Sequence, residues 1–383
     1  MPILPRSEKT PLGIYIHIPF CRSKCQYCDF YSLADTDRKL MDRYLKALCT
    51  HIKETGALAP GYRVDTVYFG GGTPSFFGAD ALGAVLTAVR QNFDVSPRAE
   101  ITFEANPDSV TPRLLHKLKS EGFNRVSLGI QTDDNALLQQ LGRPHTFEDA
   151  EQAVKRIRRA GFRNLSVDLM YGLPGQTVES FKETLRAVID LSPEHISVYG
   201  LILEEGTPLY EKQSTLSFPS EDSEYEMYLL ADRHLSRAGY SHYEISNYSR
   251  AGKESRHNLK YWRCEEYIGV GVSAHSYLDG YRFGRTQSLT EYLRGNREYL
   301  NKEYIDRDGE ALEKIMLGLR LREGISLKEY EDLFGFDLTE KYREKLITFE
   351  KMGYARILSG RLSLTAEGFY VSNYIINELT EST

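Results

Sequence analysis

The chain has 383 residues and a formal net charge of −6, with 41% hydrophobic and 27% charged residues, a composition typical of a globular protein with one large and one smaller domain. The acidic balance argues against generic nucleic-acid binding, and no apolar run approaches the ~18 residues of a membrane-spanning helix. The five cysteines provide no disulfide framework, and Met1–Thr10 lacks the apolar core of a secretory signal, so we expect a cytoplasmic protein.

Strand-like and helical patterns alternate through the first two-thirds of the chain. The β-branched runs predict six strands, at Gly13–Ile18, Val64–Phe69, Glu100–Glu104, Arg125–Ile130, Leu165–Met170 and His195–Gly200. Amphipathic patterns predict helices between them, near Arg38–Glu54, Asp80–Gln91, Thr111–Ser120, Phe147–Ala160 and Val178–Leu191. Six βα units in series imply a parallel sheet whose loops after the strands gather at one face, where the chemistry of such folds takes place.

The pattern changes near the end, and we predict two domains, residues 1–300 and 301–383. Three helices and a hairpin are expected in the second, at Ala311–Arg322, Ser326–Leu333, Leu338–Met352, Tyr354–Ile357 and Arg361–Leu364. This order is typical of a winged-helix module. From Gly309 onward 10 Lys/Arg stand against 13 Asp/Glu, so we expect a packing or lid role and no docking on DNA.

Cys21, Cys25 and Cys28 form a CxxxCxxC triplet directly after the first predicted strand. Thiolates are the ligands of iron–sulfur clusters, and a [4Fe–4S] cluster ordinarily has four of them. A compact triplet holds three irons and leaves the fourth open for a ligand that is not protein. A zinc site is the alternative, but it needs a fourth ligand nearby, and none is obvious. Three incidental cysteines are the other alternative.

Polar and glycine residues follow the other predicted strands. The turn Gly70–Pro74 comes after the second strand, where glycine lets the main chain approach a ligand closely. Glu104, Gln131, Arg143 and Asp168 lie at or near later strand ends. Carboxylates suit ribose hydroxyls, and arginine can pair with a carboxylate at two points. Each one alone is more often a cap, a turn residue or a solvated charge, and the ordered series is what predicts a site.

Two polar residues lie on the first predicted strand itself. We expect either Tyr15 or His17 to face the site and the other to lie in the core.

Several strings together resemble the HemN/HemW group of the radical S-adenosylmethionine (SAM) superfamily, namely YIHIPFCxxxCxYC, FGGGTP, EANP, SLGIQ, LGRPH, DLMYGLPGQT and the tail. The resemblance implies an α/β fold, an incomplete six-stranded parallel barrel, with a helical C-terminal domain. It implies a [4Fe–4S] cluster on Cys21, Cys25 and Cys28 with SAM bound at the open iron. The SAM-site positions that it implies are Tyr15, Gly71, Gly72, Thr73, Glu104, Gln131, Arg143 and Asp168.

Two departures separate the chain from one branch of this group. The oxygen-independent coproporphyrinogen dehydrogenases have a further cysteine, in CxxxCxxCxC, where this chain has Phe30. Those enzymes also carry a long N-terminal extension, whereas twenty residues precede Cys21 here. Both departures argue against porphyrinogen decarboxylation.

A different string takes the place of those features. His257, Tyr261 and Trp262 form HNxxYW, which resembles the signature of the HemW heme chaperones, and YIGVGVSAHS after it also looks like that family. An imidazole can ligate heme iron, and aromatic rings can pack on the macrocycle. The alternative is a hydrogen-bonded loop histidine and a core tryptophan. Reserve ligands are His242 and His275, with Cys264 a less favoured thiolate.

We therefore hypothesise a heme chaperone that binds a SAM-ligated [4Fe–4S] cluster and heme and transfers heme to apo-hemoproteins, among them respiratory membrane proteins. The alternative is a radical SAM enzyme acting on a tetrapyrrole, such as a coproporphyrinogen III dehydrogenase, and a third is a radical SAM enzyme for an unrelated small molecule. The sequence leaves open whether SAM is cleaved or only bound.

Overall fold

The computed structural model describes residues 9–34 and 36–381, which divide into two compact units. Unit 1 comprises Met1–Gly129, Leu141–Leu165 and Glu265–Tyr304. Unit 2 comprises Ile130–Gln140, Ser166–Cys264 and Ile305–Thr383.

Unit 1 is built on a sheet whose strands run in the order β12-β11-β10-β9-β1-β2-β3-β4. Strands β1 to β4 are parallel, β9 joins β1 in parallel, and the later strands are antiparallel. Their bounds are β1 (Thr10–Ile18), β2 (Tyr62–Gly71), β3 (Val95–Ala105), β4 (Arg125–Gln131), β9 (Tyr267–Val270), β10 (His275–Leu278), β11 (Tyr281–Gly284) and β12 (Leu300–Tyr304). The parallel strands consist largely of buried β-branched and aromatic residues, as expected for strands covered by helices.

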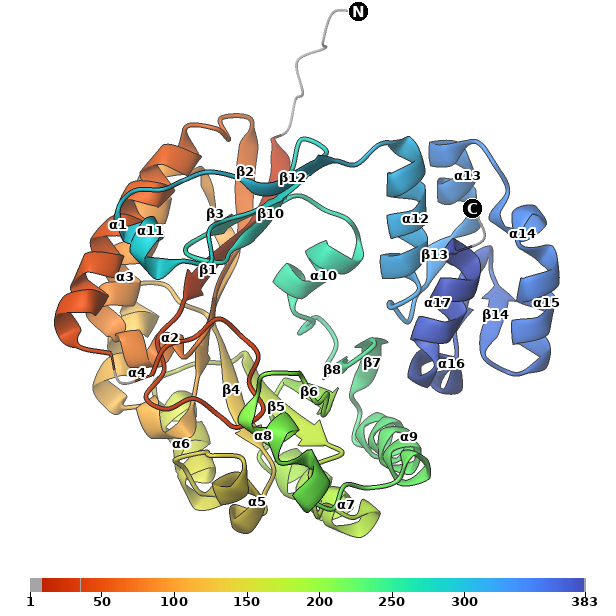
Figure 1. Ribbon diagram of the computed structural model, residues 1–383, viewed down its shortest axis with the longest axis horizontal. Helices are drawn as coiled ribbons and strands as arrows, with labels where there is room; N and C mark the ends of the chain where they lie inside the picture. Colours follow the sequence, from red (N-terminus) through yellow and green to blue (C-terminus); the bar gives the residue numbers. More distant parts are fainter. Residues whose placement is uncertain (1–8, 35, 382–383) are drawn as a thin grey trace, which may run out of the picture. The chain divides into compact units, whose positions relative to one another are not determined.

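Helices cover one side of these parallel strands (Figure 1). They are α1 (Arg38–Gly56), α3 (Ala79–Asn92), α4 (Pro112–Ser120) and α6 (Phe147–Arg159), with the short α2 (Pro74–Phe77), η1 (Pro107–Ser109) and α11 (Leu289–Leu293). Asp37, Thr111 and Thr146 cap three of them with side-chain oxygens that accept main-chain N–H groups. These caps explain why the helices begin where they do.

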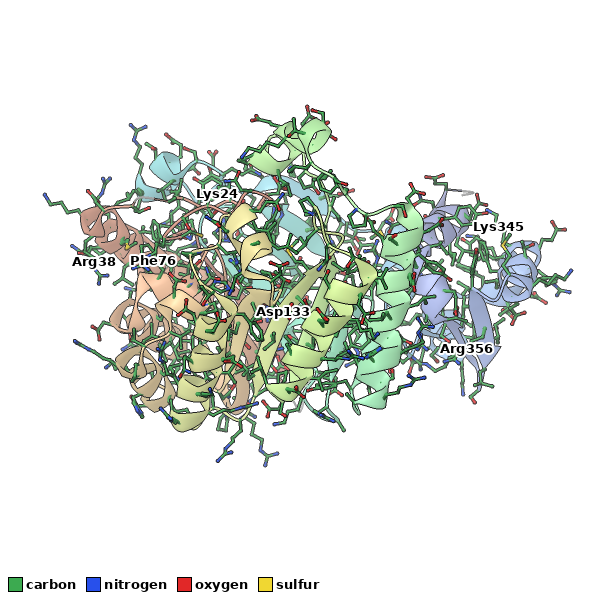
Figure 2. The ribbon with its side chains drawn as sticks, turned by 90° about the horizontal axis from the view of Figure 1, so that it is seen from below. Lys24, Arg38, Phe76, Asp133, Lys345 and Arg356 are labelled. Carbon is green, nitrogen blue, oxygen red and sulfur yellow. The ribbon has the colours of Figure 1, made fainter. Side chains whose placement is uncertain are left out.

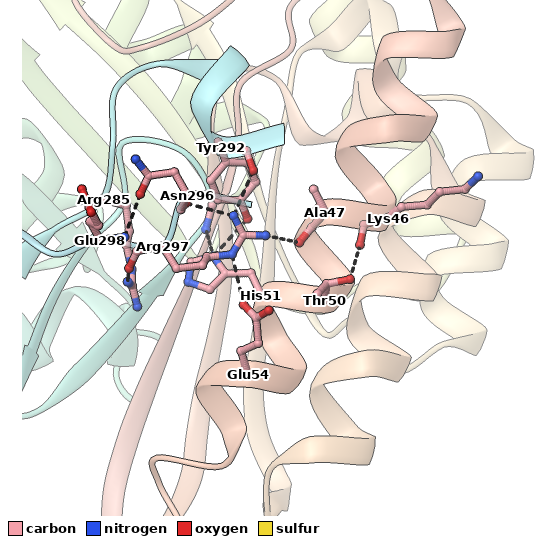
Figure 3. A network of polar contacts seen from close by, with 11 residues as sticks. Lys46, Ala47, Thr50, His51, Glu54, Arg285, Tyr292, Asn296, Arg297 and Glu298 are labelled. Atoms are coloured by element: carbon pink, nitrogen blue, oxygen red, sulfur yellow. Dashed lines mark hydrogen bonds and ion pairs between the residues drawn. The ribbon is translucent and has the colours of Figure 1, made fainter. Parts of the chain in front are cut away.

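Arg297 ties the segment before β12 to α1 (Figure 3). Its guanidinium donates to the Ala47 carbonyl (3.2 Å) and to the Glu54 carboxylate (3.1 Å). It also donates to the carbonyl of Tyr292 (2.9 Å), whose hydroxyl lies 3.0 Å from His51 Nδ1. Burial, with the charges of two arginines adding, lowers the pKa of His51 to about 2, so this imidazole is neutral.

Unit 2 contains a short sheet in the order β5-β6-β8-β7, with helices before and after it. Strands β5 and β6 are parallel, and β8 and β7 are antiparallel to their neighbours. The elements are α5 (Asn135–Gln140), β5 (Leu165–Tyr171), α7 (Val178–Asp190), β6 (His195–Gly200), α8 (Pro208–Glu211), η2 (Gln213–Thr215), α9 (Glu221–Arg237), β7 (Ser241–Glu244), β8 (Asn247–Ser249) and α10 (Arg256–Trp262).

The C-terminal part of unit 2 consists of helices and a three-stranded sheet in the order β13-β15-β14. Its elements are α12 (Arg307–Gly318), β13 (Ile325–Ser326), α13 (Leu327–Phe334), α14 (Leu338–Lys341), α15 (Arg343–Lys351), β14 (Ala355–Leu358), β15 (Arg361–Leu364), α16 (Ala366–Tyr370) and α17 (Ser372–Thr380). Ile315, Tyr330, Leu346 and Phe369 are among the residues of its buried core. Its surface carries charged side chains such as Lys345 and Arg356, which Figure 2 labels, together with exposed apolar ones such as Leu358.

The predicted fold class is confirmed. All six predicted strands exist, each within five residues of its expected ends, and the tail has the predicted helices and hairpin. The helix expected at Leu338–Met352 is interrupted at Tyr342, which divides it into α14 and α15. No strand pairing in the described part of the chain closes the parallel strands into a complete barrel. Within the same residues, no helix is long and apolar enough to cross a membrane.

Candidate functional site

The three cysteines lie on the loop that follows β1. The Cys21 amide donates to the Leu33 carbonyl (2.9 Å), and the Cys28 amide donates to the Cys25 carbonyl (3.3 Å). Cys21 is buried, Cys25 and Cys28 are half-buried, and all three are free thiols. The loop therefore presents three thiols from a main chain that is fixed by its own hydrogen bonds.

The surroundings of these thiols suit an iron–sulfur cluster. Burial raises the pKa of Cys21 and of Cys28, and the neighbouring thiols raise it further. The Thr73 hydroxyl donates to Cys21 Sγ (3.5 Å), and Arg143 Nη1 donates to Cys25 Sγ (3.4 Å). Three free thiols on one loop suit a cluster, in which each thiolate binds a different iron and is deprotonated by it.

The turn Gly71–Thr73 lies against the start of the cysteine loop. The Thr73 amide donates to the Phe20 carbonyl (2.8 Å). A Cβ on Gly72 would lie 2.8 Å from the Phe20 carbonyl oxygen and 3.0 Å from Cys21 Sγ, so only glycine fits there. Gly71 has φ +112°, which glycine adopts at little cost. The main chain of this turn can therefore approach a ligand beside the cysteines.

Glu104 reaches the same turn from β3. Its carboxylate accepts hydrogen bonds from the Gly71 amide (3.2 Å) and the Tyr68 hydroxyl (2.8 Å). The Tyr68 ring stacks on that of Tyr15, with the ring centroids 6.3 Å apart. Burial, with the charge of Glu104 adding, raises the pKa of Tyr15 well above its usual value. An ionised Glu104 beside a main-chain turn is a suitable acceptor for a cationic amino group.

Tyr15 and His17 lie on one face of β1, as residues two apart in a strand must, so the expectation that they separate between site and core is wrong. His17 Nε2 lies 2.9 Å from the Tyr31 carbonyl oxygen, which can only accept, so this nitrogen carries the proton. Nδ1 then accepts from the Tyr15 hydroxyl (3.1 Å). Burial lowers the pKa of His17 to about 4 despite the Tyr31 hydrogen bond, so the imidazole is neutral and orients Tyr15.

Arg143 joins the cysteine loop to η1 and β4. Besides Cys25, its guanidinium donates to Asn106 Oδ1 (3.3 Å) and to the Gly129 carbonyl (3.0 Å). Asn106 in turn donates to the Thr73 hydroxyl (3.2 Å). The Nε of Arg143 is buried and has no hydrogen-bond partner among the described residues, so one donor is left for a ligand carboxylate.

Gln131 and Asp168 belong to unit 2. Gln131 ends β4 as a buried residue with φ +75°, a conformation that side chains other than glycine rarely adopt. Asp168 is half-buried on β5, in register with Ser197 of β6. Unit 1 brings the other predicted SAM positions together through the contacts above, at Tyr15, Gly71, Gly72, Thr73, Glu104 and Arg143.

Helix α10 carries the HNxxYW string in unit 2. The hydroxyl of Ser255 caps it by accepting from the Asn258 amide. His257 is only 1% exposed, and its Nε2 lies 2.9 Å from the hydroxyl of Tyr261 one turn later. Their rings meet edge to face, 5.3 Å apart. His257 is therefore a helical residue with a hydrogen-bonded imidazole, and no loop histidine as the alternative supposed.

Trp262 faces a different set of groups. Its ring lies under the Arg320 guanidinium, 5.8 Å from the ring centroid, and its indole N–H points toward the fully buried Glu244. Burial raises the pKa of Glu244 to about 7, opposed by Asn247, the indole and Arg320. Neither carboxylate oxygen nor the indole nitrogen completes a hydrogen bond with any described residue. The structure thus pairs His257 with Tyr261 and places Trp262 in a separate polar pocket.

The three reserve heme ligands of the sequence analysis lie on different elements. His242 on β7 is buried, with Nδ1 2.9 Å from the Asp232 carboxylate and Nε2 3.3 Å from the Ile245 carbonyl oxygen, so both ring nitrogens are occupied. His275 is exposed on β10 of unit 1. Cys264 is half-buried just after α10 and has φ +57°.

The sequence analysis missed three residues of the cysteine site, although each lies within or directly beside a string that it quoted. Tyr68 and Asn106 hold Glu104 and Arg143 as described. Tyr27 lies between Cys25 and Cys28, and burial raises its pKa, opposed by Arg143 and assisted by the two thiols. A tyrosine between two cysteines was the only available signal for it.

A family model described as the Radical SAM superfamily matches residues 15–188, and one described as the HemN C-terminal domain matches residues 305–371. The chain is 34% identical to the heme chaperone HemW of Lactococcus lactis over 380 residues, covering 96% of this chain and 97% of that protein. The chain belongs to the HemW family.

Other relatives agree with this assignment. The heme chaperone HemW of Synechocystis is 38% identical, covering 82% of this chain and 79% of that protein. The coproporphyrinogen III oxidase HemN of Escherichia coli has the same fold, with a TM-score of 0.86 over 98% of this chain and 91% of that chain, at 24% identity. As a member of the radical SAM superfamily, the HemW-family chain uses a [4Fe–4S] cluster and SAM.

Proposed function

We propose that this chain is a heme chaperone, which binds heme together with a SAM-ligated [4Fe–4S] cluster and transfers heme to apo-hemoproteins. The observation that carries the proposal is the similarity to HemW heme chaperones over nearly the whole length of both chains. The helix α10, with His257 and Tyr261 paired on one face, supports it because imidazole is a common axial ligand of heme iron.

In this proposal Cys21, Cys25 and Cys28 hold the cluster. Each would bind one iron, and the fourth iron would accept SAM. The cluster, when bound, supplies one-electron chemistry to SAM. The structure supports a polar binding site around it in unit 1: the Gly71–Thr73 turn and Glu104 would accept from the amino group of SAM.

The remaining predicted positions have distinct parts in the same proposal. Arg143 Nε would donate to the carboxylate of SAM, and Tyr15 would line the site beside Glu104. Asp168 suits the ribose hydroxyls, and Gln131 would add a polar contact.

For heme, we propose His257 as the iron ligand, with Tyr261 and Trp262 as aromatic contacts. The clients would be apo-hemoproteins, including respiratory membrane proteins approached from the cytoplasmic side. We further propose that the protein works in the cytoplasm, and that residues 301–383 form a domain of their own.

An anaerobic heme titration of the cluster-loaded protein tests the proposal. Trp262 is the only tryptophan of the chain, so quenching of its fluorescence by heme reports binding in unit 2 beside the absorbance change. We expect saturation at about one heme per chain, and at least a tenfold loss of affinity in His257→Ala. His116→Ala, which removes an exposed imidazole from α4, is the matched control.

The other outcomes discriminate between ligands and functions. Full binding by His257→Ala would place the ligand elsewhere, and His275→Ala would be measured next. Absence of specific binding, together with a vinyl-bearing product from coproporphyrinogen III under reducing conditions, would replace the chaperone by the decarboxylating radical SAM enzyme.

A further inference from the structure

A chain of hydrogen bonds joins residues of three strands of unit 2, through the half-buried Tyr243, and ends at the N-terminus of α10. Ser166 Oγ on β5 lies 2.7 Å from Nδ1 of His195 on β6, and His195 Nε2 lies 2.7 Å from the hydroxyl of Tyr243 on β7. That hydroxyl accepts from the amide of Ser255, at 3.1 Å. Ser166 and His195 are 1% exposed, and Ser255 is fully buried.

The position of α10 depends on such anchors. It has seven residues, and isolated helices shorter than about 12 residues are marginal in water because nucleation is costly. Its N-cap is Ser255, whose hydroxyl accepts from the Asn258 amide while its own amide is held by Tyr243. His257 follows two residues after the anchored amide, so a displaced N-terminus would displace the imidazole.

The main chain of β7 is itself held in place. The Tyr243 carbonyl accepts from the Arg322 amide (3.0 Å), and the Ile245 amide donates to the Arg320 carbonyl (2.9 Å). Glu244 forms an antiparallel bridge with Leu321 between these two bonds. Tyr243 therefore projects from a fixed strand, and its hydroxyl has a fixed position to offer to Ser255.

We propose that Tyr243 is a positioning residue for heme binding, which acts by fixing the N-terminus of α10 and with it the imidazole of His257. The proposal rests on the proposed function for its heme part, but the anchoring of α10 is independent of heme. His195 and Ser166 support Tyr243 by holding its hydroxyl. Since Ser255 and His195 are buried, loss of the hydroxyl would remove a hydrogen-bond partner from both residues.

Tyr243→Phe in the full-length, cluster-loaded protein tests this. Tyr240→Phe is the matched control, because Tyr240 is a buried tyrosine beside the same strand whose hydroxyl donates to the Pro193 carbonyl (2.7 Å). Hydrogen exchange of the α10 amides is measured without heme, and heme affinity and the absorbance spectrum of the ferric complex are measured on the same samples.

The proposal expects α10 amides to exchange about tenfold faster in Tyr243→Phe, and heme to bind about tenfold more weakly, by ~1.4 kcal/mol, with a shift in the fraction of low-spin iron. Tyr240→Phe should change neither. In a His257→Ala background, Tyr243→Phe should have no additional effect on heme, because it acts through His257.

Each contrary result has its own meaning. Unchanged exchange of α10 in Tyr243→Phe overturns the anchor, whatever heme does. If α10 exchanges faster in Tyr243→Phe but heme affinity is unchanged, and His257→Ala binds heme weakly, then only the positioning role is overturned. If His257→Ala binds heme normally, the proposed ligand fails and the heme part of this inference fails with it, while the exchange data still decide the anchor.

Discussion

Glu244 provides a quantitative prediction from burial. Its side chain is fully buried in unit 2, near Asn247, Trp262 and Arg320, and burial raises its pKa from 4.5 in the unfolded chain to about 7. Between these two pH values the folded protein keeps the proton and the unfolded chain has lost it. The free energy of unfolding therefore falls as pH rises through this window.

The size of the effect follows from linkage. A difference of ~2.5 pKa units corresponds to about 3 kcal/mol of stability that Glu244 removes above pH 7, and most of this, about 2 to 3 kcal/mol, is lost between pH 5 and pH 8. Glu244→Gln keeps the shape and removes the charge. We expect Glu244→Gln to gain about 2 to 3 kcal/mol relative to the parent protein when the pH is raised from 5 to 8.

Urea unfolding at pH 5 and pH 8 measures this directly, followed by the fluorescence of Trp262, the single tryptophan, which lies beside the substituted group. The difference between the two proteins isolates Glu244 from the other titratable groups. Glu226→Gln, an exposed change on α9, is the control and should stay within about 0.5 kcal/mol of the parent protein at both pH values. In the folded state, the parent fluorescence should titrate near pH 7 and that of Glu244→Gln should not.

Equal pH dependence of the parent protein and Glu244→Gln would refute the reasoning. It would mean that water or a rearrangement solvates the carboxylate, so that burial imposes no cost on its charge.

Two further substitutions test the site residues. Glu104→Gln removes the charge that the Gly71 amide and the Tyr68 hydroxyl contact. We expect calorimetry to show that SAM binds the cluster-loaded variant about 10- to 100-fold more weakly. Unchanged affinity would show that Glu104 is not part of the SAM site. Glu100→Gln, a buried carboxyl on the same strand, is its control. Tyr261→Phe removes the hydroxyl that is hydrogen-bonded to His257 Nε2 but keeps the aromatic ring. Heme should therefore associate about three- to tenfold faster, as measured by stopped-flow absorbance. A slower association would show that the hydroxyl assists heme binding.

The sequence predicted the parallel strands well because buried parallel strands are runs of apolar residues. It missed β12 for the opposite reason: all five residues of this strand, LNKEY, are exposed and show no alternation. Likewise β7 and β8 have four and three residues, too few for a period to be seen. Helix α9, a 17-residue helix with a good cap at Ser220, was within reach of the sequence and was not predicted.

The candidate site also has parts that the sequence could predict and parts that it could not. The spacing of Cys21, Cys25 and Cys28 and the glycines after β2 are local patterns, so the sequence predicted them. The contact between Asn106 and Thr73 joins residues 33 positions apart, and the one between Arg143 and Cys25 spans 118 positions, and no local pattern encodes such pairs. Tyr243 is one of 26 tyrosines, and its contacts with His195 and Ser255, 48 and 12 positions away, distinguish it.

The cysteine site and helix α10 differ in whether their buried polar groups are already oriented for a ligand. This difference affects how each would bind. Around the cysteines, His17 and Glu104 are already oriented by fixed partners, so a ligand meets a preorganised site. On α10, by contrast, the imidazole of His257, which we propose as the heme ligand, is buried and its Nε2 is hydrogen-bonded to Tyr261. In this proposal heme reaches that nitrogen only after the hydrogen bond to Tyr261 breaks. A chaperone must also release heme. When heme leaves, His257 can re-form its hydrogen bond with Tyr261, and this bond offsets part of the free energy needed for release.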